Sequence, residues 1–296
     1  MPWSRIISGI IAIALALAAV LLGGWYFTIA IAVVVFLGHQ EYFNLVRARG
    51  IVPAAKTTMF VSQILLVICT VDGSLADAVM PIAGTFICFY LLFQPKLATI
   101  ADISASIMGL FYVGYLASYW VRLRALGSAA VSNLALGGYW PPAWADILQQ
   151  KNFAVLPQGL TVTMLTFLCI WAADIGAYIF GKFFGKTQLS NISPKKTVEG
   201  AVFGIAASVA VAFAGAYYLH FPRFFFTGIA LGLLIGIASL LGDLTESMLK
   251  RDAGVKDSGQ LIPGHGGILD RTDSYIFTAP LVYYFVTLLL PLLADK

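Results

Sequence analysis

Charged residues are scarce in this chain of 296 residues: Asp, Glu, Lys and Arg make up 11% of it, whereas 60% is hydrophobic. Soluble globular domains carry about 25% charged residues, so this composition excludes that class. Several apolar runs approach the roughly 20 residues that a helix needs to span a bilayer. We therefore predict an all-α, polytopic integral membrane protein.

Cysteine is equally rare. Cys69, Cys88 and Cys169 fall inside apolar runs and show no paired spacing. We interpret them as small buried hydrophobic residues, not as disulfides or metal ligands. Alternation of polar and apolar residues is missing from the stretch 6–22, which is unlike a membrane β-strand. Because no small-residue cleavage site and soluble domain follow this stretch, we expect it to be retained as the first helix.

The apolar runs predict about nine transmembrane helices, of which the third and fourth are short enough to be tilted or partly inserted. Their expected bounds are 6–22, 25–43, 58–72, 77–93, 102–121, 159–180, 200–218, 223–248 and 274–293. We divide the chain into N-terminal transmembrane helices, 1–121, and a C-terminal catalytic region, 122–296.

Lysine and arginine predict the orientation. If the N-terminus lies inside, alternation through nine spans places most of the 18 lysines and arginines on the inner side. This agrees with the positive-inside rule. We therefore attribute the net charge of +4 to the membrane topology and to phosphate binding, and we expect no nucleic-acid partner.

One stretch, 247–273, is rich in charge and is called the signature loop below. Its charged residues are Lys250, Arg251, Asp252, Lys256, Asp257, Asp270, Arg271 and Asp273, with glycines between them. Carboxylates bind hard divalent cations, lysine and arginine bind phosphate oxygens, and glycines let backbone N–H groups approach anions. This pattern favours a polyphosphate held through a divalent cation. A polar connector between helices is the alternative.

Carboxylates also occur inside predicted spans, where an ionised group costs about 2.5–3.5 kcal/mol and usually has a function. Asp174 is near the end of the sixth span, and Asp243 and Glu246 are near the end of the eighth. Helical spacing places four residues on one face, namely Asp243, Glu246, Ser247 and Lys250. A structural pair between Glu246 and Lys250 is the alternative.

A second basic loop follows the sixth span. It contains Lys182 and Lys186, then the run Ser193-Pro194-Lys195-Lys196-Thr197-Val198-Glu199-Gly200. We expect Ser193-Pro194 to begin the next helix and to direct its amides at an anion, and the loop to collect anionic substrate. The alternative is contact with lipid headgroups.

The signature loop resembles the signature of phosphatidate cytidylyltransferases (CDP-diacylglycerol synthases). Shared elements are Ser-x-hydrophobic-Lys-Arg, Lys-Asp, Pro-Gly-His-Gly-Gly and Asp-Arg-x-Asp. The second basic loop is similar to the same family, which carries Asp-x-x-Ala-Tyr before Gly-Lys and then Ser-Pro-Lys-Lys-Thr-x-Glu-Gly. Asp243 resembles the aspartate of the family's Gly-Asp-Leu motif, which looks like a metal ligand.

This resemblance implies the transfer of CMP from CTP to phosphatidic acid, giving CDP-diacylglycerol and pyrophosphate. It implies metal ligation by Asp243 and Asp270, with Asp174 and Asp273 as further candidates, and Mg²⁺ as cofactor, with a monovalent cation such as K⁺ as a second candidate. The implied catalytic residues are Lys250, Arg251, Lys256, Asp257, His265 and Arg271. The implied substrate-binding residues are Lys182, Ser193, Lys195, Lys196, Thr197, Glu199 and Ser247.

The expected setting is the inner (plasma) membrane, with membrane lipids as neighbours and the N-terminus and signature loop in the cytoplasm; a homodimer is left open. Two alternatives remain. A transporter or channel would also place carboxylates in broken helices, but it would show inverted repeats, which are not found in the sequence. A CTP-dependent polyprenol kinase or an archaeal ether-lipid cytidylyltransferase would use the same metal and phosphate chemistry, with a less complete signature.

Overall fold

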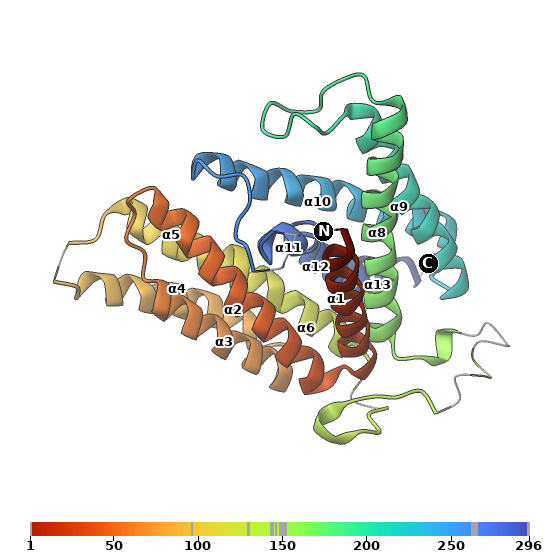
Figure 1. Cartoon of the computed structure of the whole chain (residues 1–296). Helices are drawn as coiled ribbons and strands as arrows, with labels where there is room; N and C mark the ends of the chain where they lie inside the picture. Colours follow the sequence, from red (N-terminus) through yellow and green to blue (C-terminus); the bar gives the residue numbers. More distant parts are fainter. Residues whose placement is uncertain are drawn as a thin grey trace. The chain divides into compact units, whose positions relative to one another are not determined.

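The computed structural model describes residues 2–95, 97–128, 131–142, 145, 147, 153–261 and 266–294, with the backbone alone for 2–6 and 154. In these residues the chain is mainly helical (Figure 1), and Gln188 and Thr197 form an isolated β-bridge. The predicted all-α class is confirmed.

The long helices agree with the predicted spans. Six described segments are long and apolar enough to cross a membrane, namely 24–48, 100–125, 158–184, 198–218, 224–252 and 269–294, and shorter apolar helices cover 7–22, 55–71 and 76–92. Each predicted span falls on one of these segments. The count of nine crossings stays a prediction, because three of the segments are short.

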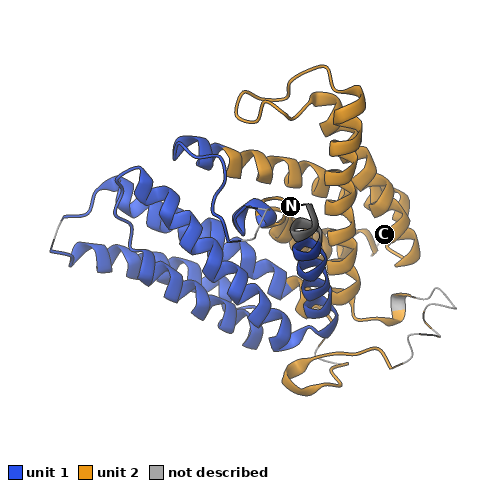
Figure 2. Cartoon of the chain, in the orientation of Figure 1, with its two compact units in different colours: residues 1–122, 248–272 blue, residues 123–247, 273–296 orange. Residues whose placement is uncertain are grey.

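The chain forms two compact units (Figure 2). Unit 1 comprises 1–122 and 248–272, and unit 2 comprises 123–247 and 273–296. Most of the signature loop therefore belongs to unit 1, together with the N-terminal helices. Helices α10 (Phe224–Asp252) and α11 (Leu269–Ile276) each contain a boundary between the units.

Unit 1 is built from α1 (Pro2–Leu22), α2 (Gly24–Ala48), α3 (Ala55–Val71), α4 (Ala76–Leu92) and α5 (Ile100–Gly109), which continues through the π-helical turn η1 (Leu110–Tyr115) into α6 (Leu116–Ala125). Helix α5 begins with a capping box, in which Thr99 and Asp102 bond each other's backbone N–H groups. Helices α2 and α3 both pack on η1. Gly109 permits this approach, because a Cβ there would lie 2.9 Å from the rings of Tyr42 and Phe43.

Unit 2 contains α8 (Gln158–Phe184), α9 (Val198–Tyr218), most of α10, and the C-terminal helices α12 (Thr278–Tyr284), η4 (Phe285–Leu289) and α13 (Leu290–Ala294). The short turns η2 (Ala135–Gly137) and η3 (Phe153–Val155) precede them. Helices α8 and α9 lie side by side (Figure 1). Glycines lie in the contacts that α9 makes with α8 and with α10. Gly200 and Gly204 of α9 face α8, and Gly232 and Gly236 of α10 face α9. Such small residues let helix backbones approach closely in lipid.

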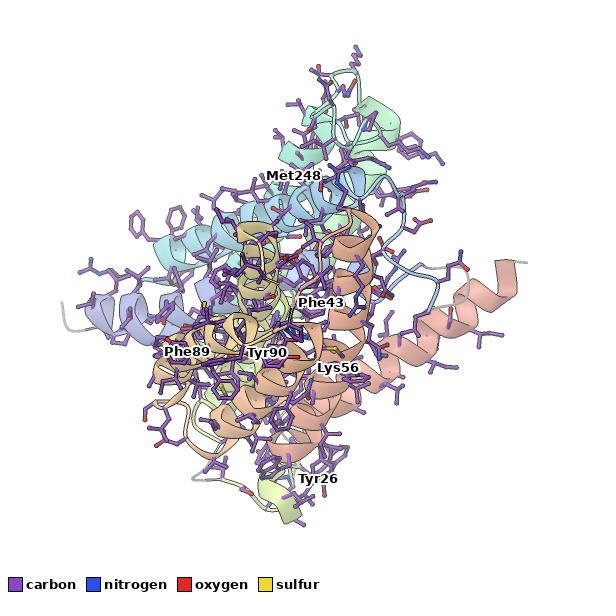
Figure 3. The ribbon with its side chains drawn as sticks, turned by 90° about the vertical axis from the view of Figure 1, so that its left-hand side faces the viewer. Tyr26, Phe43, Lys56, Phe89, Tyr90 and Met248 are labelled. Carbon is purple, nitrogen blue, oxygen red and sulfur yellow. The ribbon has the colours of Figure 1, made fainter. Side chains whose placement is uncertain are left out.

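The outer surfaces of the helices are apolar, as expected for a protein in lipid. On α4 the rings of Phe89 and Tyr90 are 58% and 42% exposed, whereas Phe43 of α2 is buried in unit 1 (Figure 3). Packing thus selects one face of each helix for protein contacts. The other face is left to the hydrocarbon of the bilayer.

The glycine contacts yield a stability prediction. A Cβ at Gly204 would lie 2.6 Å from the carbonyl oxygen of Ala173 and 3.0 Å from Cβ of Ala177. Gly204→Ala should therefore destabilise the protein by about 1–3 kcal/mol, measured as a lower melting temperature in detergent. Gly84→Ala is the matched control, because its Cβ would meet only Ile107, at 3.5 Å. Equal melting temperatures for the two variants would contradict the close α8–α9 packing.

Candidate active site

Helix α10 ends at the start of the signature loop in a defined C-terminal cap. Gly254 has a φ of 73°, a left-handed conformation that favours glycine. The N–H of Val255 donates to the carbonyl of Lys250 at 2.9 Å, and the N–H of Gly254 donates to that of Arg251 at 3.1 Å. This is the Schellman motif. It ends the helix directly after the Lys250-Arg251 pair.

Asp270, in the first turn of α11, gathers the signature loop around its carboxylate. Its Oδ1 accepts from Nζ of Lys250 at 2.6 Å. Its Oδ2 accepts from the backbone N–H groups of Ser258 and Gly267, at 3.0 and 2.8 Å, and lies 3.0 Å from the Ser258 hydroxyl. Both side chains of the Lys250–Asp270 pair are largely buried, at 12% and 8% exposure. The pair therefore closes the loop as well as carrying charge.

A second carboxylate, Glu41 of α2, supports the same loop. It is buried and accepts from the Ser258 hydroxyl and from the backbone N–H groups of Ile268 and Leu269. Sequence analysis assigns Glu41 no role. The signal that selected Asp174 and Asp243, an acidic residue inside an apolar helix, also applies to Glu41.

The remaining charged groups of the loop lie on the surface. Arg251, Lys256, Asp257 and Arg271 are exposed, and a guanidinium nitrogen of Arg251 donates to the carbonyl of Val255 at 3.3 Å. The predicted catalytic residue His265 lies outside the described residues. Of the predicted phosphate-binding cations, Lys250 is thus engaged inside the loop, whereas Arg251, Lys256 and Arg271 are presented to solvent.

Three carboxylates converge within unit 2. Asp174 of α8, Asp243 of α10 and Asp273 of α11 interact electrostatically with one another, and Asp273 also interacts with Glu246. Asp174 also lies near the hydroxyls of Ser239 and Ser274. Three residues that sequence analysis proposes as metal ligands are therefore neighbours in the fold. Asp270, the fourth, lies in unit 1.

Lys196 supplies positive charge to this group. Its ammonium forms a salt bridge with Asp243 and interacts electrostatically with Asp174. The side chains of Lys196 and Asp243 are 24% and 32% exposed, so water screens the pair only in part. Ser247, predicted to bind substrate, lies one turn beyond Asp243, and its hydroxyl is 3.4 Å from that carboxylate.

The second basic loop owes its shape to the residues of its motif. Thr197 caps α9 by accepting from the N–H of Gly200 at 3.1 Å. Glu199 folds the loop back by accepting from the N–H groups of Lys186 and Thr187. Helix α9 begins at Val198, so the prediction that Ser193-Pro194 begins a helix is wrong. The N–H of Lys196 instead donates to the carbonyl of Ser193 in a turn.

The exposed cations of this loop are Lys182, Lys186 and Lys195. They are available to an anion, whereas Lys196, Thr197 and Glu199 have contacts within unit 2. The structure therefore divides the motif into surface cations and residues that shape the loop.

The donor chemistry of the unit 2 carboxylates fits a hard cation. Carboxylate oxygens are the ligands that Mg²⁺ prefers, and of the three carboxylates Asp243 and Asp174 interact with the ammonium of Lys196. Within the described part of the chain, however, no group of three or more His, Cys, Asp or Glu side chains is placed to coordinate one ion. Charge balance, and not a formed coordination sphere, supports a cation here.

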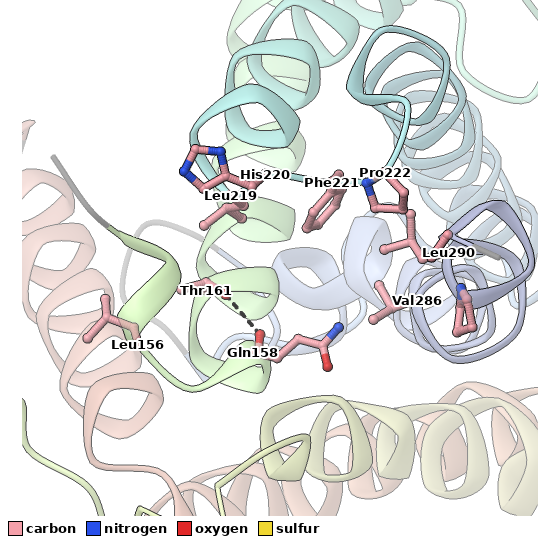
Figure 4. Close-up of a pocket in the computed structure, with 11 residues that line it drawn as sticks. Leu156, Gln158, Thr161, Leu219, His220, Phe221, Pro222, Val286 and Leu290 are labelled. Atoms are coloured by element: carbon pink, nitrogen blue, oxygen red, sulfur yellow. Dashed lines mark hydrogen bonds between the residues drawn. The ribbon is translucent and has the colours of Figure 1, made fainter. Parts of the chain in front are cut away.

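Unit 2 also contains an open cavity of about 310 Å³ (Figure 4). Gln158, Thr161, His220, Val286 and Leu290 contribute to its lining. Measured from Gln158, Asp174 lies about 24 Å further along α8, because an α-helix rises 1.5 Å per residue. The cavity is therefore at the opposite end of α8 from the basic loop.

These observations define an all-α integral membrane protein in which carboxylates of the helices in unit 2 adjoin the second basic loop. The chain belongs to the cytidylyltransferase family, whose model matches residues 3–289.

Individual relatives agree over most of the chain. It is 65% identical over 297 residues to a phosphatidate cytidylyltransferase of Synechocystis sp., covering 99% of both chains. It is 44% identical over 274 residues to the chloroplastic phosphatidate cytidylyltransferase 4 of Arabidopsis thaliana, covering 90% of this chain and 68% of that one. It is 32% identical over 298 residues to a phosphatidate cytidylyltransferase of Haemophilus influenzae, covering 95% and 97%.

The Lys196–Asp243 pair is testable by its effect on stability. Lys196→Ala leaves Asp243 without its salt-bridge partner, so the free energy of unfolding in the absence of divalent cations should fall by about 1–3 kcal/mol, between the values typical of exposed and buried pairs. Thermal unfolding in detergent with a chelator measures this. Lys195→Ala removes an exposed neighbouring lysine and should leave the melting temperature unchanged. An equal, small effect of both variants would contradict a stabilising pair.

Proposed function

We infer that this protein is a phosphatidate cytidylyltransferase, which transfers the cytidylyl group of CTP to phosphatidate and releases pyrophosphate. The observation that carries this inference is the 65% identity to such an enzyme over nearly the whole chain. The signature loop and its carboxylate-supported fold are consistent with it. The reaction belongs to phospholipid biosynthesis.

The chemistry demands positioning and charge neutralisation more than a base. A phosphate oxygen of phosphatidate attacks the α-phosphorus of CTP, and the bond from that phosphorus to the bridging oxygen breaks, so that its electron pair leaves with pyrophosphate. The lipid phosphomonoester has a second pKa of about 6 and is already anionic near neutral pH. The site must therefore align the two phosphates and offset their charge.

In this proposal the exposed cations of the signature loop, Arg251, Lys256 and Arg271, bind phosphate oxygens. Lys250 has a different part, because its ammonium is held by Asp270 inside the loop. In this assignment Lys250 and Asp270 keep the surface cations in position. The exposed lysines of the second basic loop, Lys182 and Lys195, add positive charge that attracts anionic substrates.

We assign Asp174, Asp243 and Asp273 to a Mg²⁺ ion. When bound, the ion would neutralise charge on the phosphates of CTP. Charge balance and the all-oxygen donor set support this assignment. The donors that surround Asp270 within unit 1 favour a loop-folding role for that residue, and its part in metal binding stays a prediction.

Purified enzyme in mixed micelles tests the activity. With labelled CTP, phosphatidate should yield CDP-diacylglycerol and pyrophosphate. Polyprenol and an archaeal ether-lipid phosphate serve as competing acceptors. A preference for either of these acceptors would show that the protein catalyses a different reaction with the same metal and phosphate chemistry.

The metal assignment predicts a specific defect. Asp243→Asn removes a ligand charge and should lower turnover by about 100-fold or more, as loss of one stabilising group at a reacting phosphate or oxyanion does. Activity is measured across a Mg²⁺ titration. Asp72→Asn, an exposed aspartate in the α3–α4 turn, is the control and should behave as wild type. Near-normal turnover with unchanged Mg²⁺ dependence in Asp243→Asn would remove that residue from the metal site.

We further propose that the signature loop faces the cytoplasm, where CTP is found, in a plasma membrane. The bias of lysine and arginine supports this orientation. Cysteines at Gln260 and Ser74, both exposed, in a background lacking the three native cysteines, should then react from opposite sides. If an impermeant thiol reagent labels both from outside intact cells, the orientation is wrong.

A further inference from the structure

Glu41 lies about two turns before the C-terminal end of α2, and its carboxylate accepts hydrogen bonds from the signature loop. Oε1 accepts from the N–H of Ile268 at 2.9 Å. Oε2 accepts from the N–H of Leu269 at 3.0 Å and from the hydroxyl of Ser258 at 2.8 Å. An ionised carboxylate buried among apolar residues is costly unless hydrogen bonds satisfy it. Here three donors do so, and all come from the loop.

The backbone of the loop is shaped to receive this carboxylate. A Cβ at Gly259 would lie 2.5 Å from Oε1 of Glu41, and a Cβ at Gly267 would overlap Oε2. Glycine is therefore required at both positions for the loop to close around Glu41. Gly259 lies at the middle of the loop and Gly267 near its end, so one side chain holds these two parts of the loop together.

Ser258 connects Glu41 to Asp270. Its hydroxyl lies 2.8 Å from Oε2 of Glu41 and 3.0 Å from Oδ2 of Asp270, and it carries a single proton to share between them. Its N–H also donates to Asp270. Asp270 in turn holds Lys250. The positions of Asp270 and Lys250 thus depend on a contact that begins in α2.

A second contact, made by the end of α2, also joins this helix to the signature loop. Arg49, at the C-terminal cap of α2, lies 3.5 Å from the carboxylate of Asp252, where α10 ends. Both residues are exposed, so this contact contributes little energy. It does place the end of α2 beside the beginning of the loop, whereas Glu41, about two turns earlier in α2, contacts the loop's end.

We propose that Glu41 is a positioning residue for the transfer reaction. It holds the turn before α11, and through Ser258 it sets Asp270, Lys250 and the exposed cations of the loop in the arrangement that binds and aligns phosphates. It touches no substrate itself, because its oxygens are occupied. The proposal rests on the proposed cytidylyltransferase activity and adds to it a residue from the N-terminal helices.

Glu41→Gln is the most informative variant, because it keeps the volume and changes the hydrogen bonding. The amide oxygen can still accept from Ile268, but the NH₂ group replaces Oε2 and faces the N–H of Leu269. If Glu41 only fills space, this variant equals wild type. If it positions the loop by accepting hydrogen bonds, kcat should fall by about 10- to 100-fold, as small displacements of reacting groups do, with Glu41→Ala at least as impaired.

Ser258→Ala interrupts the connection between Glu41 and Asp270. It therefore tests the proposal even if the Glu41 variants fail to fold. It should lower kcat, and its effect should not add to that of Glu41→Gln, because both interrupt one connection. Gln40→Ala is the matched control, since Gln40 is the exposed neighbour of Glu41 on α2. Its kcat should equal that of wild type.

Hydrogen exchange supplies a readout independent of turnover. In Glu41→Gln and Ser258→Ala, the amides of Ser258, Ile268 and Leu269 should exchange faster, while those of α9 keep wild-type protection. Wild-type kcat together with wild-type exchange in both variants would overturn the proposal, as would a lower melting temperature with unchanged kcat. If wild-type enzyme fails to use CTP, the proposed activity is lost, and exchange still decides whether Glu41 positions the loop.

Discussion

The cost of placing charge in an apolar surrounding governs this structure. A carboxylate among hydrocarbon side chains is tolerated only when donors or cations satisfy it, and the chain meets this condition repeatedly. The buried guanidinium of Arg122 donates to the carboxylate of Asp77 at 2.8 and 3.0 Å, and the carboxylate of Asp270 accepts from Lys250 and from two loop amides. The Arg122–Asp77 and Lys250–Asp270 pairs join residues that are 45 and 20 positions apart in sequence. Polar contacts therefore determine where the loops attach, whereas apolar packing determines how the helices associate.

Glycine makes these polar contacts possible. Between helices it removes the Cβ that would separate α8, α9 and α10, and the carboxylates of Asp174 and Asp243 belong to two of these closely packed helices. In the signature loop it does the same for Glu41 at Gly259 and Gly267. A glycine-rich loop is often taken as a cradle for phosphate. Here two of the glycines first serve a carboxylate of the protein itself.

This arrangement separates two tasks that the charged residues share. Lys250, Asp270, Glu41 and Ser258 are buried or half-buried and bond one another, so they shape the loop. Arg251, Lys256 and Arg271 are exposed and can meet a ligand. A polyphosphate site needs both, because cations that move freely lose the preorganisation that makes electrostatic stabilisation effective. The second basic loop repeats the division, with Glu199 and Thr197 shaping the backbone and Lys182 and Lys195 exposed.

The amino-acid sequence by itself determined the fold class, the approximate bounds of the helices and the family, because apolar run length and a long unbroken motif are local properties of the chain. It also identified Asp174 and Asp243 as acidic residues in apolar runs, and Asp273 as part of the signature motif. Only the tertiary structure decided that Lys196 pairs with Asp243, that α9 begins at Val198, and that Glu41 closes the loop. The Lys196–Asp243 pair and the closure by Glu41 depend on contacts between residues far apart in sequence; the bond from Ser258 to Glu41 spans 217 positions. No local pattern encodes which of several buried charges will meet, because that choice is made by the packing of the helices that carry them.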